Sequence, residues 1–423
     1  MNTIKTASFY SLGCRVNQYE EQSIREMFIN LGYQILNFGT KTDVCVINTC
    51  AVTAESERKS RNFIARASKV SKKVIVTGCY AELLSKQKKT ADGAFYVGGC
   101  KQKSLIPLIA DDNYDLPYCH TPEYENIQIG TTDSLPDNRC RAYIKIQDGC
   151  NGNCSYCLIP YLRGKSVSRS SVDIVREAKR LAMAGVKEVI LTGIETSDYD
   201  DIPLCELLIK ISQTDGIERI RLGSLNINCI TDEFIATIKS SKKFCRHLHL
   251  SLQSASNRIL NLMRRPYSKE KANFIIKKIY SEIPEMLISV DIITSFPSET
   301  EAEFLETVEF VKEKTFMHVH AFSYSPRPFT DAALIKSSIS LAEKKHRNEY
   351  LITVSEQVKQ SIMDKKVGEH VSILVEKHDD FFAYGHTADF LEAKIHKSNA
   401  QTGDIINAKV CGHDEILICE EFK

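Results

Sequence analysis

The sequence of 423 residues lacks several features that mark whole classes of protein. No stretch approaches the roughly 20 consecutive apolar residues of a membrane-spanning helix, and the start, MNTIKTASFYSLGC, lacks the apolar run of a secretory signal. Neither sign of charge is in excess, since 55 basic residues face 54 acidic ones, which argues against a polybasic nucleic-acid binder. Proline is scarce (11 residues) while 43% of residues are hydrophobic, which argues against disorder. These absences predict a globular, cytoplasmic protein without a membrane partner.

Cysteine, in contrast, is abundant, at 15 residues. The odd number, the length of the chain and the lack of an export signal argue against a disulfide scaffold, because such scaffolds are small and secreted. In a reducing compartment, clustered cysteines are metal ligands or catalytic thiols, and scattered ones are small buried side chains. The question is therefore which cysteines cluster.

The order of strand-like and helix-like runs predicts an α/β protein of three parts. Residues 1–115 alternate the two kinds of run, which is typical of a doubly wound parallel sheet. In residues 136–364 the alternation continues for six units, which we expect to curl into a partial (β/α)6 barrel, two units short of a closed one. Residues 365–423 show short strand-like runs without helices and predict a small all-β barrel. Residues 111–141 are polar, contain three prolines and are interpreted as a linker.

Three expected strands of the second part alternate polar and apolar side chains: Tyr143–Gln147, His247–Gln253 and Leu287–Ser295. Because helices cover the outside of a β/α barrel, the apolar faces should point outward and the polar faces into the lumen. A closed eight-stranded barrel fills its lumen with bulky branched side chains. A polar lumen therefore predicts a wider, partly open barrel that holds a polar cofactor and substrate.

The sharpest motif is a C-x3-C-x2-C loop, whose Cys150, Cys154 and Cys157 we call the loop trio. Three thiolates this close can wrap one polynuclear centre. A structural zinc ion takes four ligands, and ferredoxin-type clusters also take four. Three ligands leave one iron of a [4Fe–4S] cluster open for a cofactor. We therefore favour a cluster, with zinc or unrelated core cysteines as the alternatives.

Three cysteines of the first part, Cys14, Cys50 and Cys79, each follow the end of an expected strand. We call them the sheet trio. Ligands of an open α/β sheet bind outside the carboxyl ends of its strands, so these cysteines can converge on one site. The alternative is three unrelated buried thiols. Cys45 is a control, because it lies inside an expected strand and is assigned to the core, and the remaining cysteines, Cys100 included, are interpreted as mostly structural.

The residues around both trios resemble those of one superfamily. The run from Tyr143 to Gly164 resembles the radical S-adenosylmethionine enzymes, and more specifically their tRNA methylthiotransferases. The resemblance extends to three motifs of the first part: Gly13-Cys14-Arg-Val-Asn17-Gln18, Asn48-Thr49-Cys50-Ala-Val52 and Gly78-Cys79. The approach Arg139–Gln147 and the run Tyr324–Pro328 resemble most the members that modify threonylcarbamoyladenosine.

This resemblance implies an enzyme that inserts a methylthio group at C2 of N6-threonylcarbamoyladenosine, at position 37 beside the tRNA anticodon. It implies two [4Fe–4S] clusters. The one on the loop trio cleaves S-adenosyl-L-methionine to a 5′-deoxyadenosyl radical, and the one on the sheet trio carries the sulfur. Because C2 carries an unactivated aromatic C–H, we expect cofactor chemistry and no acid–base dyad. The two trios are expected to face one another across a shared cavity.

The resemblance also implies contacts and partners. The residues expected to contact S-adenosyl-L-methionine are Tyr156, Gly193, Asn226 and Gln253. Expected partners are the tRNA anticodon loop, a reductant such as flavodoxin or ferredoxin, and a sulfur donor. Alternatives within the same chemistry are isopentenyladenosine in tRNA and a ribosomal-protein aspartate as substrates. An alternative of a different functional class is that the chain is a non-catalytic Fe–S module that binds RNA or carries sulfur.

Several positions depart from the usual pattern of the family. Asn226 carries an amide where an acid is common, and Thr192–Glu195 is not followed by a glycine-rich stretch. Ser295, Ser298 and Phe329 stand where glycines are frequent. These departures bear on the cofactor contacts and on the substrate, and leave the cluster motifs intact.

Two segments bear on RNA binding. The expected helix Glu55–Lys73 carries seven basic and two acidic side chains, which suits phosphate contacts, although a solvated helix face is the alternative. Residues 365–423 resemble the TRAM domain, an OB-like barrel that binds RNA. They contain seven lysines against eleven acidic residues, so contact with RNA would need a local patch or the aromatic side chains of Phe381, Phe382 and Tyr384.

Overall fold

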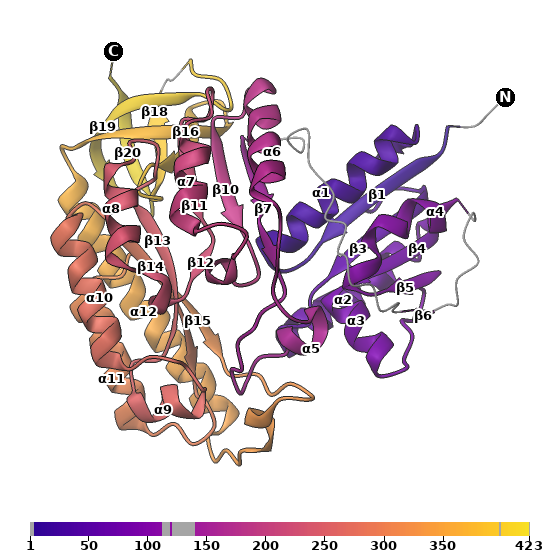
Figure 1. Cartoon of the computed structure of the whole chain (residues 1–423), viewed down its shortest axis with the longest axis horizontal. Coiled ribbons are helices and arrows are strands. Elements are labelled where there is room, and N and C mark those ends of the chain that lie inside the picture. Colours follow the sequence, from indigo (N-terminus) through magenta and orange to yellow (C-terminus); the bar gives the residue numbers. More distant parts are fainter. Residues whose placement is uncertain (1–3, 112–118, 121–139, 397–398, 423) are drawn as a thin grey trace. The chain divides into compact units, whose positions relative to one another are not determined.

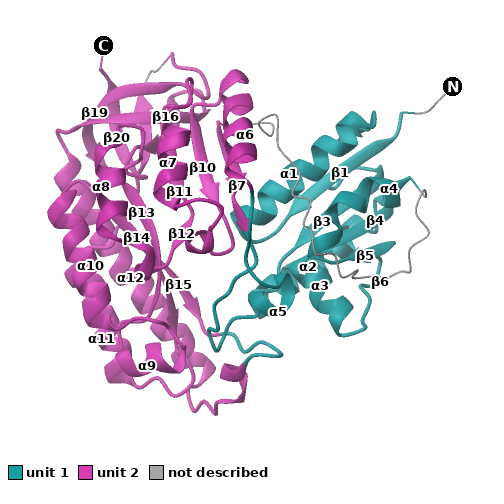
Figure 2. Ribbon diagram, viewed as in Figure 1, with its two compact units in different colours: residues 1–132, 148–169, 325–330 teal, residues 133–147, 170–324, 331–423 magenta. Residues whose placement is uncertain are grey.

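A computed structural model of the chain describes residues 4–111, 119–120, 140–396 and 399–422 (Figure 1). These residues form two compact units (Figure 2), of which unit 1 comprises residues 1–132, 148–169 and 325–330, and unit 2 comprises residues 133–147, 170–324 and 331–423. The predicted domain boundaries at residues 115 and 136 and most of the predicted linker 111–141 lie outside the described residues. The boundary at residue 364 falls within helix α12 (Leu341–Lys366). The division into three domains therefore stays a prediction.

Unit 1 contains a six-stranded parallel sheet in the order β2-β1-β3-β4-β5-β6, which confirms the predicted doubly wound sheet. Its strands are β1 (Thr6–Ser11), β2 (Gln34–Ile35), β3 (Thr42–Thr49), β4 (Ser71–Gly78), β5 (Tyr96–Gly98) and β6 (Cys119–His120). Its helices are α1 (Arg15–Asn30), α2 (Ala54–Ala67), α3 (Cys79–Lys86), α4 (Ile106–Ala110) and the 3-10 turn η1 (Cys100–Leu105).

Strand β3 shows why this sheet is covered on both faces. Val44 and Val46 pack in an apolar cluster that includes side chains of α1 and α4, whereas Cys45 and Ile47 pack in a second cluster with side chains of α2 and α3. Successive side chains of a strand point to opposite faces, so a strand buried on both sides needs a continuous apolar run. Cys45 is 1% exposed, which confirms its assignment to the core.

The segment 148–169 belongs to unit 1, although it follows the first barrel strand in sequence (Figure 2). It contains α5 (Ile159–Arg163) and the short strand β9 (Val167–Ser168), which pairs with β8 (Gln147–Asp148). Leu158 and Leu162 are buried in the apolar cluster that also contains side chains of α2 and α3. Burial of these two leucines anchors the segment on the core of unit 1.

Unit 2 contains the six predicted strand positions of a partial β/α barrel, all parallel, in the sheets β7-β10-β11 and β12-β13-β14-β15. The strands number seven because β11 and β12, which are separated by one residue, share one of the six positions. The strands are β7 (Arg141–Lys145), β10 (Glu188–Thr192), β11 (Arg219–Leu222), β12 (Ser224–Leu225), β13 (His247–Gln253), β14 (Leu287–Thr294) and β15 (His318–Ser323). The helices are α6 (Ser171–Met183), α7 (Leu204–Ser212), α8 (Asp232–Ser240), α9 (Asn257–Leu262), α10 (Lys269–Glu282), α11 (Glu301–Lys314) and α12, with short turns η2 (Thr196–Asp198), η3 (Ile227–Cys229) and η4 (Asp331–Leu334). None of these helices, nor any other in the described part of the chain, is long and apolar enough to cross a membrane.

The predicted alternation of polar and apolar faces is present in the barrel strands. The leucines of β13 pack in the main apolar cluster with side chains of the surrounding helices. On its other face, His247 Nε2 lies 2.7 Å from Ser289 Oγ, and His249 Nδ1 lies 3.1 Å from the same hydroxyl. His249 Nε2 lies 2.9 Å from the Asp291 carboxylate. The polar face is thus lined by side chains that hydrogen-bond one another, as buried polar groups must.

The C-terminal residues of unit 2 form the predicted small all-β barrel, closed in the order β16-β17-β18-β20-β19. Its strands are β16 (His370–His378), β17 (Phe382–Thr387), β18 (Glu392–His396), β19 (Ile405–His413) and β20 (Leu417–Glu421). These five strands confirm the short strand-like runs that the sequence predicted for this region.

A buried charge cluster attaches this small barrel to the amino ends of β7, β10 and β11. Glu188, the first residue of β10, is 0% exposed and lies 2.9 Å from Arg221, 3.5 Å from Arg219 and 3.7 Å from Arg141. Burial raises the pKa of Glu188, but the charges of Arg221 and Arg141 outweigh burial and hold it below its usual range. The carboxylate is therefore ionised and balances part of the arginine charge.

The same arginines reach the small barrel with their remaining donors. Arg219 Nη2 donates to the Ser372 carbonyl at 2.7 Å, and Arg221 Nη2 donates to the Thr387 carbonyl at 2.8 Å. The ring of Phe390 packs against the guanidinium of Arg221, 4.7 Å from ring centroid to guanidinium carbon. Glu188 therefore orients side chains that join the two parts of unit 2.

Candidate functional site

The sheet trio lies at the carboxyl ends of three neighbouring strands of unit 1. Cys14 caps α1 after β1, Cys50 directly follows β3, and Cys79 begins α3 directly after β4. Burial, together with the nearby sulfurs of Cys79 and Cys14, raises the pKa of Cys50 to about 11. The structure thus brings the three thiols together at one edge of the sheet, where an open α/β fold binds its ligands.

Two glycines allow the backbone to approach closely at this edge. Gly13 has φ of +95°, and a Cβ at this position would lie 2.9 Å from Cys50 Sγ. Gly78 has φ of +90°, and a Cβ there would lie 2.5 Å from the Thr49 carbonyl oxygen. Any residue other than glycine is disfavoured at both positions, because the backbone has a positive φ and because a Cβ would clash with its neighbours. This explains why glycine precedes Cys14 and Cys79.

Cys100 is a residue of this site that the sequence analysis missed. It begins η1, separated by one residue from the end of β5, the strand next to β4, and its thiol hydrogen-bonds to the sulfur of Cys79. This bond, together with the charge of Arg163, lowers the pKa of Cys79 to about 6 despite burial. Cys100 lacks a paired spacing, but it follows a strand end just as Cys14, Cys50 and Cys79 do, and that signal could have found it.

The loop trio lies on the segment that follows β8. The amide of Gly152 donates to Cys150 Sγ at 3.2 Å, and the amide of Cys157 donates to the Cys154 carbonyl at 3.1 Å. A Cβ on Gly152 would lie 3.1 Å from Cys150 Sγ and 4.0 Å from Cys154 Sγ. The loop therefore curls closely around its first two sulfurs, with an amide directed at one of them.

Both trios offer donors that suit an iron–sulfur cluster. Each consists of three thiols, which are the usual ligands of such clusters, and hydrogen bonds from amides or side chains to the sulfurs are the usual means of tuning them. Among the residues that the structure describes, no three His, Cys, Asp or Glu side chains lie close enough to hold a single metal ion. A four-iron cluster is larger than one ion and takes its thiolates at wider spacing. The ligand assignment itself stays a prediction, as does a cavity shared by both trios.

A fully buried arginine connects the two cysteine-bearing segments within unit 1. Arg163, the last residue of α5, bonds both carboxylate oxygens of Asp148, at 2.9 and 3.0 Å, and thereby closes the base of the loop that carries the loop trio. It also donates to Asn17 Oδ1 at 2.7 Å and to both oxygens of Glu20, at 3.0 and 3.1 Å, on helix α1. Its Nε donates to Cys79 Sγ at 3.4 Å.

The carboxylates around Arg163 are matched by positive charges. Glu20 is shared by Arg163 and Lys103, and Lys103 also donates to Asn48 Oδ1 at 3.2 Å. Two cations therefore face the two carboxylates of Glu20 and Asp148. A buried ion pair keeps its stability only when its charges and hydrogen bonds are satisfied, and here they are.

The four residues predicted to contact S-adenosyl-L-methionine are divided between the units. Tyr156 lies within the loop trio segment in unit 1, whereas Gly193, Asn226 and Gln253 stand at or directly after the ends of β10, β12 and β13 in unit 2. A Cβ on Gly193 would lie 2.8 Å from the side-chain oxygen of Gln147 and 3.2 Å from its Cβ, so a larger residue at this position would require Gln147 to shift. The side chain of Asn226 caps the turn η3. Their contacts with the cofactor stay a prediction.

The departures at glycine positions have a structural counterpart. Ser295, Ser298 and Phe329 adopt φ of +58°, +66° and +66°, in the left-handed region that glycine occupies without cost. A residue with a side chain held there costs about 1–3 kcal/mol, so the surrounding structure must hold it. For Ser295 and Ser298, which follow β14, the surrounding contacts are visible.

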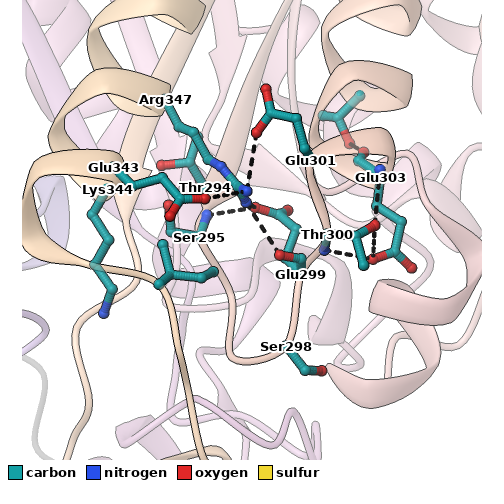
Figure 3. A network of polar contacts seen from close by, with 12 residues as sticks. Thr294, Ser295, Ser298, Glu299, Thr300, Glu301, Glu303, Glu343, Lys344 and Arg347 are labelled. Carbon is teal, nitrogen blue, oxygen red and sulfur yellow. Dashed lines mark hydrogen bonds and ion pairs between the residues drawn. The ribbon is translucent and has the colours of Figure 1, made fainter.

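Two arginines, Arg347 and Arg258, hold the loop that contains these serines. Glu299 accepts the backbone amide of Ser295 at 2.7 Å and Arg347 Nη1 at 3.2 Å. Figure 3 shows that Arg347, from α12, also reaches carboxylates on either side of Glu299. Arg258 donates to the Ser298 carbonyl at 2.6 Å and pairs with a carboxylate of α11. These contacts fix the loop at the carboxyl end of β14.

The acid at the centre of this loop predicts a pH dependence. Burial raises the pKa of Glu299 more than the hydrogen bonds from Ser295 and Arg347 lower it, so the pKa is about 7. In the unfolded chain the pKa of Glu299 has its ordinary value, so the folded state favours the protonated acid. The contribution of the protonated Glu299 to the free energy of unfolding is therefore lost as the pH rises toward 7. Between pH 5 and pH 8 we expect Glu299→Gln to gain about 2–3 kcal/mol in free energy of unfolding relative to the unsubstituted chain.

Two measurements check this expectation. Denaturant unfolding of the metal-free chain and of Glu299→Gln across pH 5–8 gives the difference in stability. Difference infrared spectra should show a carboxyl band that titrates near pH 7 and is missing in the variant. The exposed Glu206→Gln serves as the control, with no such dependence, and a constant stability difference across this range contradicts the prediction.

The basic run of residues 55–73 is not one helix, which corrects the sequence analysis. Helix α2 ends at Ala67, and β4 begins at Ser71 because this segment pairs with β3 inside the sheet. Lys72 pairs with Asp43 at 2.7 Å, and Lys73 donates to the Ala110 carbonyl at 3.0 Å. Two of the seven basic side chains thus serve the sheet, and RNA binding by the rest stays a prediction.

The aromatic side chains proposed for RNA lie around the turn between β16 and β17. Phe381 is 71% exposed, whereas Tyr384 donates its hydroxyl to Asp379 at 2.7 Å. The rings of Phe382 and Tyr384 lie 6.1 Å apart. Phe381 is therefore the side chain of this group best placed to stack on a base, and that role stays a prediction.

Comparison with known families agrees with the motifs. The sequence profile described as "Radical SAM superfamily" matches residues 144–311, and that of "Uncharacterized protein family UPF0004" matches residues 6–99. The chain is 37% identical to "Threonylcarbamoyladenosine tRNA methylthiotransferase MtaB" of Chlamydia pneumoniae, over 91% of this chain and 90% of the relative. It is 34% identical to "tRNA-2-methylthio-N(6)-dimethylallyladenosine synthase" of Wolinella succinogenes, over 89% and 90%. It is 32% identical to "Ribosomal protein uS12 methylthiotransferase RimO" of Clostridioides difficile, over 95% of each.

A solved structure shares the fold. The radical S-adenosylmethionine methyltransferase TsrM of Kitasatospora setae, solved with cobalamin and a [4Fe–4S] cluster, superimposes with a TM-score of 0.56 over 78% of this chain and 77% of that one, at 13% identity. At that identity the likeness concerns the fold alone. The relatives in sequence carry the assignment, because each is more than 30% identical and is covered almost completely. This chain belongs to the radical SAM methylthiotransferases, a family of enzymes that transfer a sulfur-containing group.

Proposed function

We propose that this chain is a tRNA methylthiotransferase that inserts a methylthio group at C2 of N6-threonylcarbamoyladenosine, at position 37 next to the anticodon. The observation that carries the proposal is the presence of six thiols, as two trios, in one compact unit with Arg163 bonded to both cysteine-bearing segments. The choice of threonylcarbamoyladenosine is supported by the 37% identity to a relative named for that nucleoside.

The chemistry of the target explains why two metal sites are needed. The hydrogen at C2 of an adenine is not acidic, so a carboxylate or an imidazole cannot remove it as a proton at neutral pH. When bound, two [4Fe–4S] clusters and S-adenosyl-L-methionine supply the one-electron chemistry, the sulfur and the methyl group. The chain supplies the ligands, the positions and a site shielded from water.

Each group of residues has a distinct part in this proposal. The loop trio binds one cluster through three thiolates and leaves one iron open, with Tyr156 beside the cofactor. The sheet trio binds the second cluster. In unit 2, Gly193 gives the cofactor access to the backbone, and Asn226 and Gln253 offer amides at neighbouring strand ends. The target base must be splayed out of the anticodon loop, as recognition of single-stranded RNA permits.

Mass spectrometry of nucleosides from a deletion strain tests the substrate. We expect 2-methylthio-N6-threonylcarbamoyladenosine to disappear from the tRNA, N6-threonylcarbamoyladenosine to accumulate, and the unsubstituted gene to restore the product. A strain with a neutral change, Cys45→Ala, should behave as the parent because Cys45 lies in the core of β3. An unchanged amount of the methylthio product in the deletion strain overturns the proposal.

The same strain distinguishes the second candidates. Relatives named for dimethylallyladenosine and for ribosomal protein uS12 match at 34% and 32% identity, so these substrates are the alternatives. Loss of the methylthio form of isopentenyladenosine, or a lower mass of protein uS12, identifies either one. A non-catalytic Fe–S module is identified by reduced, reconstituted protein that releases no 5′-deoxyadenosine from S-adenosyl-L-methionine. Flavodoxin or ferredoxin as reductant, and a separate sulfur donor, are the partners that we propose for these assays.

A further inference from the structure

Cys79 has a special environment within the sheet trio. Its sulfur accepts two hydrogen bonds from side chains, one from Arg163 Nε at 3.4 Å and one from the Cys100 thiol. Both donors are buried, as is Cys79 itself. One donor comes from the next strand end of the sheet, and the other comes from α5, at the end of the segment that carries the loop trio.

Arg163 uses all three of its nitrogens in this arrangement. Nε bonds the sulfur of Cys79, Nη1 bonds Asp148 and Glu20, and Nη2 bonds Asn17 and Glu20. The partners lie on α3, on β8 and on α1, so one planar group fixes three segments at once. A guanidinium can do this because its five N–H donors diverge in a fixed plane, whereas a lysine ammonium has one nitrogen.

We propose that Arg163 is a positioning residue that couples the two trios, fixing the loop trio segment on α1 and α3 and setting the reduction potential of a cluster bound through Cys79. The inference rests on the proposed function, because it takes the sheet trio as cluster ligands. A hydrogen bond to a ligand sulfur stabilises the more negative, reduced cluster and so raises its potential. Arg163 and Cys100 both act in this direction, but only Arg163 also holds the loop trio segment.

The test separates these two effects with three variants. Arg163→Lys keeps a positive charge and loses the divergent bonds. Cys100→Ala removes the second donor to Cys79 and leaves residues 148–163 untouched. Arg169→Lys is the matched control, because Arg169 is a buried arginine of the same segment that donates to Tyr19 on α1 at 3.0 Å. All are made in the full chain, and also in a chain with alanine at Cys150, Cys154 and Cys157, so that one cluster remains.

Two measurements are made on each variant. Hydrogen exchange of the metal-free chain, followed by mass spectrometry, reports the amides of residues 149–164, among them Cys150, whose amide donates to the Gly164 carbonyl at 3.1 Å. For Arg163→Lys we expect exchange there to become faster by about tenfold or more. An electron paramagnetic resonance titration of the one-cluster chain reports its reduction potential, which we expect Arg163→Lys and Cys100→Ala to make more negative.

The outcomes are distinct. Faster exchange and a more negative potential in Arg163→Lys, a more negative potential alone in Cys100→Ala, and neither change in Arg169→Lys support the inference. An unchanged potential in Arg163→Lys overturns it, because Arg163 is then a structural residue only, and so does unchanged exchange. If the chain with the three alanines binds no cluster, the ligand assignment of the proposed function fails. Exchange in the metal-free chain still decides whether Arg163 fixes the segment.

Discussion

Replacing Cys150, Cys154 and Cys157 together by alanine is expected to halve the iron that the anaerobically reconstituted chain binds. Release of 5′-deoxyadenosine from S-adenosyl-L-methionine should fall to the background, and no methylthio product should form. The reason is that three thiolates are the whole ligand set of one cluster, so a chain without them keeps only the cluster of the sheet trio. Iron and sulfide analysis and chromatography of the reaction mixture measure both quantities.

The complementary substitution separates the two sites. Alanine at Cys14, Cys50 and Cys79 should also halve the iron, but the chain should still release 5′-deoxyadenosine while forming no methylthio product. Cys45→Ala removes a cysteine that is 1% exposed and lies inside β3, away from the carboxyl end where Cys50 follows, and the variant should keep all the iron. Retention of the full iron content by either triple variant contradicts the ligand assignment for that trio.

Much of the fold follows from the local pattern of the sequence. In β3 the run Val44-Cys-Val-Ile47 is apolar at successive positions, which is what a strand covered on both faces requires, and the structure buries all four residues. In β13 alternate residues are polar, which is what a barrel strand with a polar lumen requires, and His247 and His249 indeed bond to Ser289. Both patterns involve residues that are neighbours in the sequence, so they can be recognised without the structure.

The contacts of the site that escaped the sequence analysis join residues far apart in the chain. Arg163 bonds Cys79, which is 84 positions away, and Glu20, which is 143 positions away. No periodicity or spacing relates such residues, and a buried charge looks in sequence like any surface charge. The place of Cys100 in the site could have been predicted, because this residue follows a strand end. It was missed because no other cysteine lies near it in the sequence. The prediction of one basic helix over residues 55–73 was wrong because it rested on the number of basic residues in this range. That number does not reveal that α2 ends and β4 begins within it.

Glu188 offers the test with the largest expected effect on stability. Its carboxylate is 0% exposed and lies among three arginines, each of which is largely buried. Removing one partner of a buried ion pair leaves an uncompensated buried charge, which costs about 3–5 kcal/mol. We therefore expect Glu188→Gln to lower the free energy of unfolding by about 3 kcal/mol or more, even though glutamine has nearly the same size.

The position of Glu188 also predicts where the loss appears. Arg219 and Arg221 use their remaining donors to hold the carbonyls of Ser372 and Thr387 in the small barrel. Without the carboxylate that orients them, the attachment of the small barrel should weaken, and limited proteolysis should cut more readily between α12 and β16. The control is Glu206→Gln, whose exposed pair with Lys210 at 3.2 Å contributes no more than about 1 kcal/mol. Equal losses in the two variants contradict the prediction, because the stability would then not depend on balancing the buried arginines.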